Sequence, residues 1–433
     1  MGGTFGLFLG IMPVLKYGIP LIFVPLSLIY FLNNFRATKI KIGLFAFQYC
    51  LFQVFITIWH ANSADNFFIQ TELPLIKSYA VLAFMIFPFC CLIFLKAEKL
   101  EAGTYFGLLG SVILLIVDYV YRDNCRASVF SSNPLIPSFI MLPMFGYIAS
   151  RRLIEGRTNF LDLGLLALMV FVVSAIGGNR MAFYIAICMA LFAVLYTTWR
   201  SDLKRSMFIL IALCLGIFTS FVVDRGTACG FWDRIQNQAD IITAKVNIVE
   251  DVTVLITSAP ESGSFAEREN PADNISSVIA GSSVSVGSIE TDEVVQQTVT
   301  EHSSLQRMVM WSNSLRYIET FRFEWLLGIG RAGERQIANE LTGTSYSHVH
   351  NQYLSWLLEG GLLGLLSGVL LFGPLVIYAF KSFPVFIFMF AVASGFLTNS
   401  LMLSGEASAQ MVLLVLFVQV LEWQRRVGGH EAQ

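Results

Sequence analysis

Long apolar segments recur along most of the chain, and they are the feature that most constrains its fold. In a hydrocarbon layer every backbone N–H and C=O group must be satisfied internally, so the chain crosses as helices of about 20 residues. Apolar segments of suitable length lie near 5–32, 42–59, 75–95, 103–121, 135–149, 160–176, 181–199, 206–223, 356–380, 384–402 and 408–423. We expect an all-α polytopic membrane protein with about eleven or twelve transmembrane helices. The count stays open because 5–32, with Lys16, Gly18 and three prolines, can form one helix or two.

The composition supports the same fold class. Hydrophobic residues make up 55% and charged residues 13% of the chain, whereas an average soluble domain carries roughly 25% charged residues. The mean hydropathy is +0.67. The seven cysteines show no metal-binding spacing. Cys125 and Cys229 are the two cysteines outside apolar segments. They are either two unrelated thiols or, if both face an oxidising compartment, a disulfide. We expect no metal, no cofactor and no nucleic-acid partner.

Basic residues in the short loops indicate the orientation. Counting the spans in order places the following residues on one side: Arg36, Lys39, Lys41, Lys96, Lys99, Arg151, Arg152, Arg157, Arg200, Lys204, Arg205, Lys381, Arg425 and Arg426. By the positive-inside rule that side is the cytoplasm. The opposite loops contain few basic residues. The orientation puts Arg180, the long segment 224–350 and His350 on the outer face of the membrane.

The chain divides into three parts on this basis. Residues 1–223 form an N-terminal transmembrane bundle, 224–350 a large periplasmic loop, and 351–433 C-terminal transmembrane helices with a cytoplasmic tail. Within the loop, 250–302 is acidic and of low complexity, which predicts a flexible stretch. Apolar residues then recur at intervals of three and four, which predicts an amphipathic helix over about 304–321, lying on the membrane rim.

The stretch 345–364 combines polar and apolar halves, and we expect it to hold the functional site. His348 and His350 lie in the polar half, and Asn351 is a plausible N-cap for a helix that runs into the next apolar span. The positive end of that helix disfavours imidazolium, so His350 should be neutral and able to accept a proton. Backbone N–H groups at the same helix end can bind a phosphate.

Several motifs resemble the bacterial O-antigen ligase and Wzy-type polymerase superfamily. They are Arg307-x-x-x-Trp311, the Leu327-Gly-Ile-Gly330 turn, and His350-Asn351-Gln-Tyr353-Leu354 followed by Glu359-Gly360-Gly361 and Gly364. Gly177-Gly178-Asn179-Arg180 is similar to the arginine patch that the family carries between two central spans. The acidic 250–302 insert departs from the family pattern.

The resemblance implies a metal-independent GT-C glycosyltransferase acting at the periplasmic face. Its donor would be a glycan on undecaprenyl pyrophosphate, and its acceptor a sugar hydroxyl on a lipid-linked glycan or on the lipid A core. Membrane lipids and a chain-length regulator are the further expected partners. We favour a surface-polysaccharide polymerase, because the outer loop is not strongly basic and lipid A core carries many phosphates. The alternatives are an O-antigen ligase, a polysaccharide or lipid transporter, and a scaffold that recruits partners through the outer loop.

Individual residues receive provisional roles. His350 would be the catalytic base, although a histidine that only caps a helix is the alternative. Arg180 would bind the donor pyrophosphate, because burying an arginine near membrane depth costs free energy and such residues usually have a function. The alternative is a structural arginine whose guanidinium reaches the lipid headgroups. The remaining predicted substrate contacts, each with a structural alternative, are Arg307, His348, Asn351, Tyr353 and Glu359.

Overall fold

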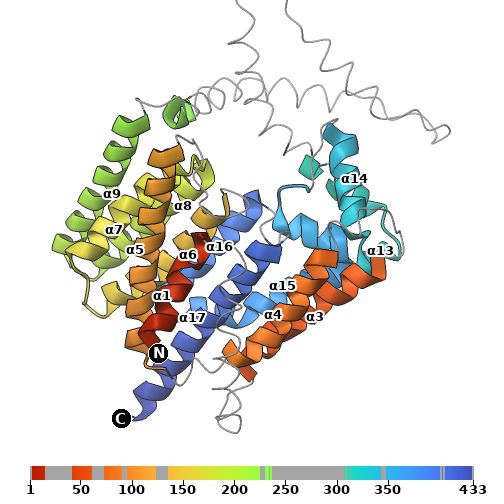
Figure 1. Ribbon diagram of the computed structural model, residues 1–433, viewed down its shortest axis with the longest axis horizontal. Helices are drawn as coiled ribbons and strands as arrows, with labels where there is room; N and C mark the ends of the chain where they lie inside the picture. The colour runs from red at the N-terminus through yellow and green to blue at the C-terminus, as the bar shows by residue number, and fades with distance from the viewer. Residues whose placement is uncertain are drawn as a thin grey trace, which may run out of the picture.

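The protein is all-α in its described parts (Figure 1). The computed structural model describes residues 2–14, 41–60, 73–89, 95–122, 135–224, 230–233, 235–236, 307, 310–312, 314–342, 348–399, 402 and 405–431. The acidic segment 250–302, Cys125 and Cys229 lie outside these residues. Of the predicted helix 304–321, residues 307, 310–312 and 314–321 are described, and all of them except 320 and 321 are helical, as expected.

Each predicted apolar range coincides with a helix over its described residues. The helices are α1 (Gly2–Ile11) with the 3-10 turn η1 (Met12–Val14), α3 (Lys41–His60), α4 (Leu73–Phe89), α5 (Ala97–Arg122), α6 (Leu135–Ile154), α7 (Phe160–Phe171) with the π turn η5 (Val172–Ile176), α8 (Arg180–Trp199), α9 (Leu203–Asp224), α13 (Glu324–Leu327), α14 (Gly330–Thr342), α15 (Gln352–Ala379), α16 (Phe383–Thr398) and α17 (Gly405–Glu431). Six of those described are long and apolar enough to cross a membrane, and three shorter ones are apolar. The total of eleven or twelve crossings stays a prediction.

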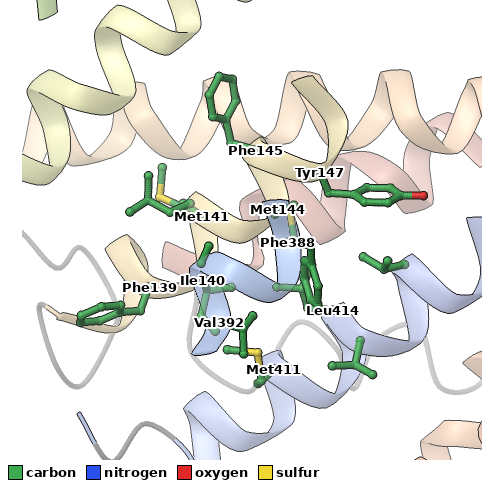
Figure 2. Close-up of a cluster of buried hydrophobic side chains, with 14 of the residues drawn as sticks. Phe139, Ile140, Met141, Met144, Phe145, Tyr147, Phe388, Val392, Met411 and Leu414 are labelled. Atoms are coloured by element: carbon green, nitrogen blue, oxygen red, sulfur yellow. The ribbon is translucent and has the colours of Figure 1, made fainter. Parts of the chain in front are cut away.

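Helices α6, α16 and α17 form the centre of the bundle. The stretch 411–421 of α17 is apolar on nearly every side, which is the pattern of a helix surrounded by others. Figure 2 shows Met411 and Leu414 of α17 beside Phe388 and Val392 of α16 and Ile140 of α6. Helices α5, α7, α8 and α9 lie on one side of this centre, and α3, α4, α13, α14 and α15 on the other (Figure 1).

Glycines allow α1 and α5 to pack backbone against backbone. A Cβ added at Gly6 would overlap the Leu100 carbonyl, and one added at Gly107 would overlap the Leu7 carbonyl. Ser111 of α5 donates a hydrogen bond of 2.7 Å to the Gly10 carbonyl of α1. In a lipid environment, where the hydrophobic effect does not drive helices together, small residues and interhelical hydrogen bonds hold such pairs.

The loops that the sequence assigns to the cytoplasm meet at one end of the bundle. Arg151 pairs with Glu101 at 3.2 Å, linking the start of α5 to the end of α6. The Arg205 guanidinium donates to the Gly156 carbonyl at 3.4 Å, and the Gln424 amide donates to the Leu95 carbonyl at 2.7 Å. Three basic loops and the C-terminal tail therefore lie at the same end of the bundle. This is the arrangement expected if successive spans cross the membrane in opposite directions.

Two glycine-to-alanine substitutions should change stability in opposite directions. Gly107→Ala should lower the midpoint of thermal unfolding, because overpacking costs roughly 1–3 kcal/mol. Gly164→Ala in α7, where a Cβ meets nothing within 4 Å, should raise it, since alanine favours a helix over glycine by roughly 0.5–1 kcal/mol. Thermal unfolding of the purified protein in detergent measures both. Equal shifts in the two variants would contradict the α1–α5 interface.

Candidate functional site

His350 precedes the membrane helix α15 and has a backbone conformation unusual for a histidine. Its φ is 55°, in the left-handed region that non-glycine residues rarely adopt. The next residue, Asn351, caps α15: its side-chain oxygen accepts from the N–H groups of Tyr353 at 3.0 Å and Leu354 at 3.2 Å. The N-cap predicted from the sequence is confirmed. The Asn351 amide also donates to the Leu397 carbonyl of α16 at 3.3 Å, which ties the site to the central helices.

Helix α15 is not the continuous span that the sequence predicted. Gly361 has φ 58° and ψ −148°, so the helix breaks there into 352–360 and 362–379. Added Cβ atoms at Gly364 and Gly368 would overlap the Trp356 carbonyl and the Trp356 ring respectively, which shows that the two parts fold against each other. At 1.5 Å per residue the second part is about 27 Å long, close to the thickness of the hydrocarbon core, and the first only about 14 Å.

His348 and His350 form a close pair. Their ring centroids are 4.2 Å apart, and the His350 backbone N–H donates to Nδ1 of His348 at 3.2 Å. His348 therefore carries its ring proton on Nε2 when it is neutral. Burial, and then the positive charge of Arg307, lower the pKa of His348 to about 4. Burial, His348 and Arg307 lower the pKa of His350 to about 3. Both imidazoles are neutral at physiological pH, as expected for His350 from the sequence.

Both backbone polar groups of Val349, which lies between the two histidines, are hydrogen-bonded to side chains. The indole N–H of Trp311 donates to its carbonyl at 2.8 Å, and its N–H donates to Oε1 of Glu334 at 3.1 Å. The Arg307-x-x-x-Trp311 motif thus has a physical role: one helical turn brings Trp311 onto the histidine stretch and Arg307 within electrostatic range of both rings.

A buried ionic cluster lies under the histidine stretch, and the sequence reasoning missed most of it. Arg331 of α14 pairs with Glu359 of α15 at 3.2 Å, and Ser355 donates to Glu334 at 2.6 Å. Glu334 is 1% exposed, and neither Glu334 nor Arg331 is among the site residues predicted from the sequence. The available signal was the Arg331-x-x-Glu334 spacing, because residues three apart share a helix face.

The Leu327–Gly330 turn packs into the break of α15. Gly328 has φ 70°, and a Cβ there would overlap the backbone of Leu358 and Glu359. The Ile329 N–H donates to the Leu358 carbonyl at 2.7 Å. His60, at the end of α3, donates from Nε2 to the Leu327 carbonyl at 2.9 Å. The predicted glycine turn is confirmed, and its glycines are needed for this close approach.

Arg180 lies at the same end of the bundle, on α8. The π turn Val172–Ile176 and Gly178 with φ 55° reverse the chain, and the Asn179 side chain caps α8 by accepting from the Ala182 N–H at 3.1 Å. Helix α8 runs antiparallel to α16, because Tyr196 stacks on Phe383 at 4.4 Å. The start of α8 therefore points towards the end of α16, where Asn351 bonds Leu397.

The other predicted site residues have structural contacts of their own. Tyr353 packs against Trp356 and Phe396, and its hydroxyl donates to the Ala393 carbonyl at 3.4 Å. Glu359 is buried in its ion pair with Arg331. These contacts favour packing and orientation over substrate contact for both residues. Among the described residues, no group of three or more His, Cys, Asp and Glu side chains is placed to hold a metal ion.

One family of known proteins matches part of the chain. The family model described as O-antigen ligase matches residues 164–369, from α7 into the second part of α15. A search of curated proteins finds no match for the chain. In its described parts the chain is therefore an all-α, multi-pass membrane protein with a region similar to O-antigen ligases. Over the matched residues it is similar to the O-antigen ligase family, in agreement with the resemblance seen in the sequence motifs.

Two Asn351 variants distinguish the contribution of its helix cap from that of its hydrogen bond to Leu397. Asn351→Ala should destabilise the protein by roughly 0.5–2 kcal/mol, because it removes the N-cap of α15. Asn351→Asp should keep the cap acceptor and lose only the bond to Leu397, so its thermal unfolding midpoint should fall less. The midpoint of each variant in detergent measures this. If Asp and Ala lower it equally, the cap is not the contact that matters.

Stability should fall on mild acidification because of the two histidines. Their pKa values in the folded protein, about 4 and 3, lie below the ordinary value near 6.5. Between those values the unfolded chain binds more protons, so this contribution is fully present above about pH 6.5 and is lost as pH falls towards 4. His350→Asn, which tolerates the left-handed backbone, should flatten the dependence. Unfolding midpoints from pH 7.5 to 5 test this, and an unchanged slope would contradict it.

Proposed function

We propose that the protein transfers a glycan from a polyprenyl-pyrophosphate carrier, undecaprenyl pyrophosphate in bacteria, to a sugar hydroxyl at the periplasmic face of the inner membrane. The observation that carries this proposal is the neutral His350, held in a left-handed conformation at the mouth of α15 beside Arg307. The family match supports a glycosyltransferase-like activity. The donor, the acceptor and the residue roles are our inference.

In the proposed step the imidazole of His350 accepts the proton of the acceptor hydroxyl. The hydroxyl oxygen attacks the anomeric carbon of the donor glycan and forms the new glycosidic bond. The bond from that carbon to the pyrophosphate oxygen breaks, and its electron pair leaves with the polyprenyl pyrophosphate. General-base help of this kind contributes about 10²- to 10⁴-fold in rate, and no redox partner is needed.

Arginines at this end of the bundle are suited to hold the pyrophosphate. Arg307 is within electrostatic range of His350. Arg180 occupies the first turn of α8, where the helix dipole disfavours a cation. An anion bound nearby would offset that cost, and arginine can contact phosphate oxygens in a bidentate manner. Both residues are therefore proposed to bind the donor and stabilise the leaving group.

A bound pyrophosphate also explains how a histidine with such a low pKa can act as a base. A general base works best with a pKa near the operating pH. Burial and the Arg307 charge keep the pKa of His350 low. The negative charge of the donor would offset Arg307 and favour imidazolium, which raises the pKa of His350. The base would then become effective only when the donor is in place.

The charge of the outer segment favours a lipid-linked glycan over lipid A core as the acceptor. Acidic residues outnumber basic ones in 224–350, and such a surface disfavours approach of a phosphate-rich acceptor. We therefore propose a polymerase, with an O-antigen ligase as the alternative within the same chemistry.

His350→Ala should reduce transfer by about 10²-fold or more, because the proton acceptor is lost. Arg180→Ala should weaken donor use. The measurement is the rate of glycan transfer by purified protein in liposomes containing the lipid-linked donor and acceptor. His430→Ala, near the far end of α17, and Arg425→Ala, an exposed arginine at the cytoplasmic end, are matched controls with expected wild-type rates. Full transfer by His350→Ala would remove the proposed mechanism.

The acceptor is tested in the same liposomes. Chain growth on lipid-linked glycan, with no product on lipid A core, is expected for the polymerase. Product only on lipid A core would replace that assignment with a ligase and leave the His350 chemistry intact.

A further inference from the structure

The left-handed conformation of His350 needs support from its neighbours, and Glu334 supplies part of that support. A non-glycine residue in this region costs on the order of 1–3 kcal/mol and persists only where the surroundings enforce it. On one side of His350, Asn351 is fixed as the cap of α15. On the other side, Val349 is fixed at its carbonyl by Trp311 and at its N–H by Glu334.

Glu334 also joins the two helices that flank the histidines. Its Oε1 accepts from Val349 at 3.1 Å and from Ser355 at 2.6 Å, so one oxygen links α14, the histidine stretch and the first turn of α15. The Glu359 carboxyl lies within hydrogen-bonding reach of Glu334, and Arg331 pairs with Glu359 at 3.2 Å. Two carboxyl groups therefore share one cation in a buried site.

Charge balance in this cluster indicates which of the two carboxyl groups, Glu334 or Glu359, is protonated. Two carboxylates beside a single guanidinium would leave a buried negative charge, which is costly. Two carboxyl groups can hydrogen-bond to each other only if one is protonated. Glu359 contacts Arg331 directly, so the proton belongs on Glu334. Burial raises the pKa of Glu334 and outweighs the hydrogen bonds with Ser355, Val349 and Glu359 and the Arg331 charge, all of which lower it. Tyr49 and Tyr79, the other titratable groups close to Arg331, add no cation.

We propose that Glu334 is a positioning residue for His350: as a neutral carboxylic acid it accepts from Val349 and Ser355, donates to Glu359, and so holds the imidazole in its left-handed setting. The proposal rests on the proposed role of His350 for its kinetic consequences. Its structural consequence does not depend on any activity. Glu334 itself touches no reacting atom in this account, since it acts through the Val349 backbone.

The neutral state gives the proposal a sharp test. Glutamine has the shape of a protonated glutamate: its oxygen can accept both bonds and its NH₂ can donate to Glu359. Glu334→Gln should therefore behave as wild type. Glu334→Ala removes the acceptor, and Glu334→Asp shortens the side chain by one methylene, so both should release Val349. Glu319→Gln and Glu319→Ala, at an exposed glutamate outside the cluster, are the matched controls.

The first measurement is the rate at which diethyl pyrocarbonate modifies His350 in the full-length protein, resolved by mass spectrometry. Glu334→Ala and Glu334→Asp should raise this rate about threefold or more, and Glu334→Gln should leave it within about twofold of wild type. The second is glycan transfer in liposomes. The same two variants should lower kcat about tenfold or more while the KM for the donor changes less, and Glu334→Gln should restore kcat.

Each outcome decides the proposal. Equal modification rates in all variants would overturn the positioning role. A Glu334→Gln variant that resembles Glu334→Ala would show that a charged carboxylate is needed and would overturn the neutral-acid account. If Glu334→Ala does not fold, Glu334→Gln and Glu334→Asp carry the same comparison. Failure of the proposed function appears elsewhere, as full transfer by His350→Ala, while the modification rates would still report on Glu334.

Discussion

Close backbone packing between the Leu327–Gly330 turn and the break of α15 determines the geometry of the site. The break at Gly361 exists because a glycine can adopt φ 58° there, and any Cβ would overlap the backbone of Leu326 and Gly328. This contact fixes where α14 begins and where the first part of α15 ends. Arg331 and Glu334 of α14 are thereby brought against Glu359 and Ser355 of α15. The histidine stretch is attached to the resulting unit.

The buried ionic cluster is better understood as a device for orientation than as a source of stability. Removing two charges from water costs several kcal/mol per ion, and their attraction often no more than repays it. A single misplaced partner, however, would leave an uncompensated buried charge. The cluster therefore permits few alternative arrangements of α14 on α15. The hydrogen bond from the Val349 N–H to Glu334 places Val349 relative to this cluster, and Val349 in turn restricts the backbone of His350.

The sequence predicted the helices well, because their apolar length is a direct consequence of the bilayer. It also predicted the Asn351 cap and the glycine turn, since both follow from local chemistry. It did not predict the break at Gly361, because 356–380 is apolar apart from Glu359 and Ser367 and a glycine in a membrane helix is ordinary. It missed Glu334 because the importance of that residue comes from Val349 and Ser355, 15 and 21 residues away. The histidine pair was found from its residue type and position; the contacts that hold it were not.

The short first part of α15 gives the site its place relative to the bilayer. The second part is long enough to cross the hydrocarbon core, so the first part, folded back against it, lies at one end of that span with Trp356 between the two. His350 is thus placed where burial can keep an imidazole neutral while the bilayer is adjacent. The lipid-linked donor that we propose could reach this position from the adjacent leaflet without leaving the membrane. The proposed roles of His350 and of the lipid-linked donor fit together here, because the carrier of such a donor stays in the bilayer while its glycan reacts at the membrane surface.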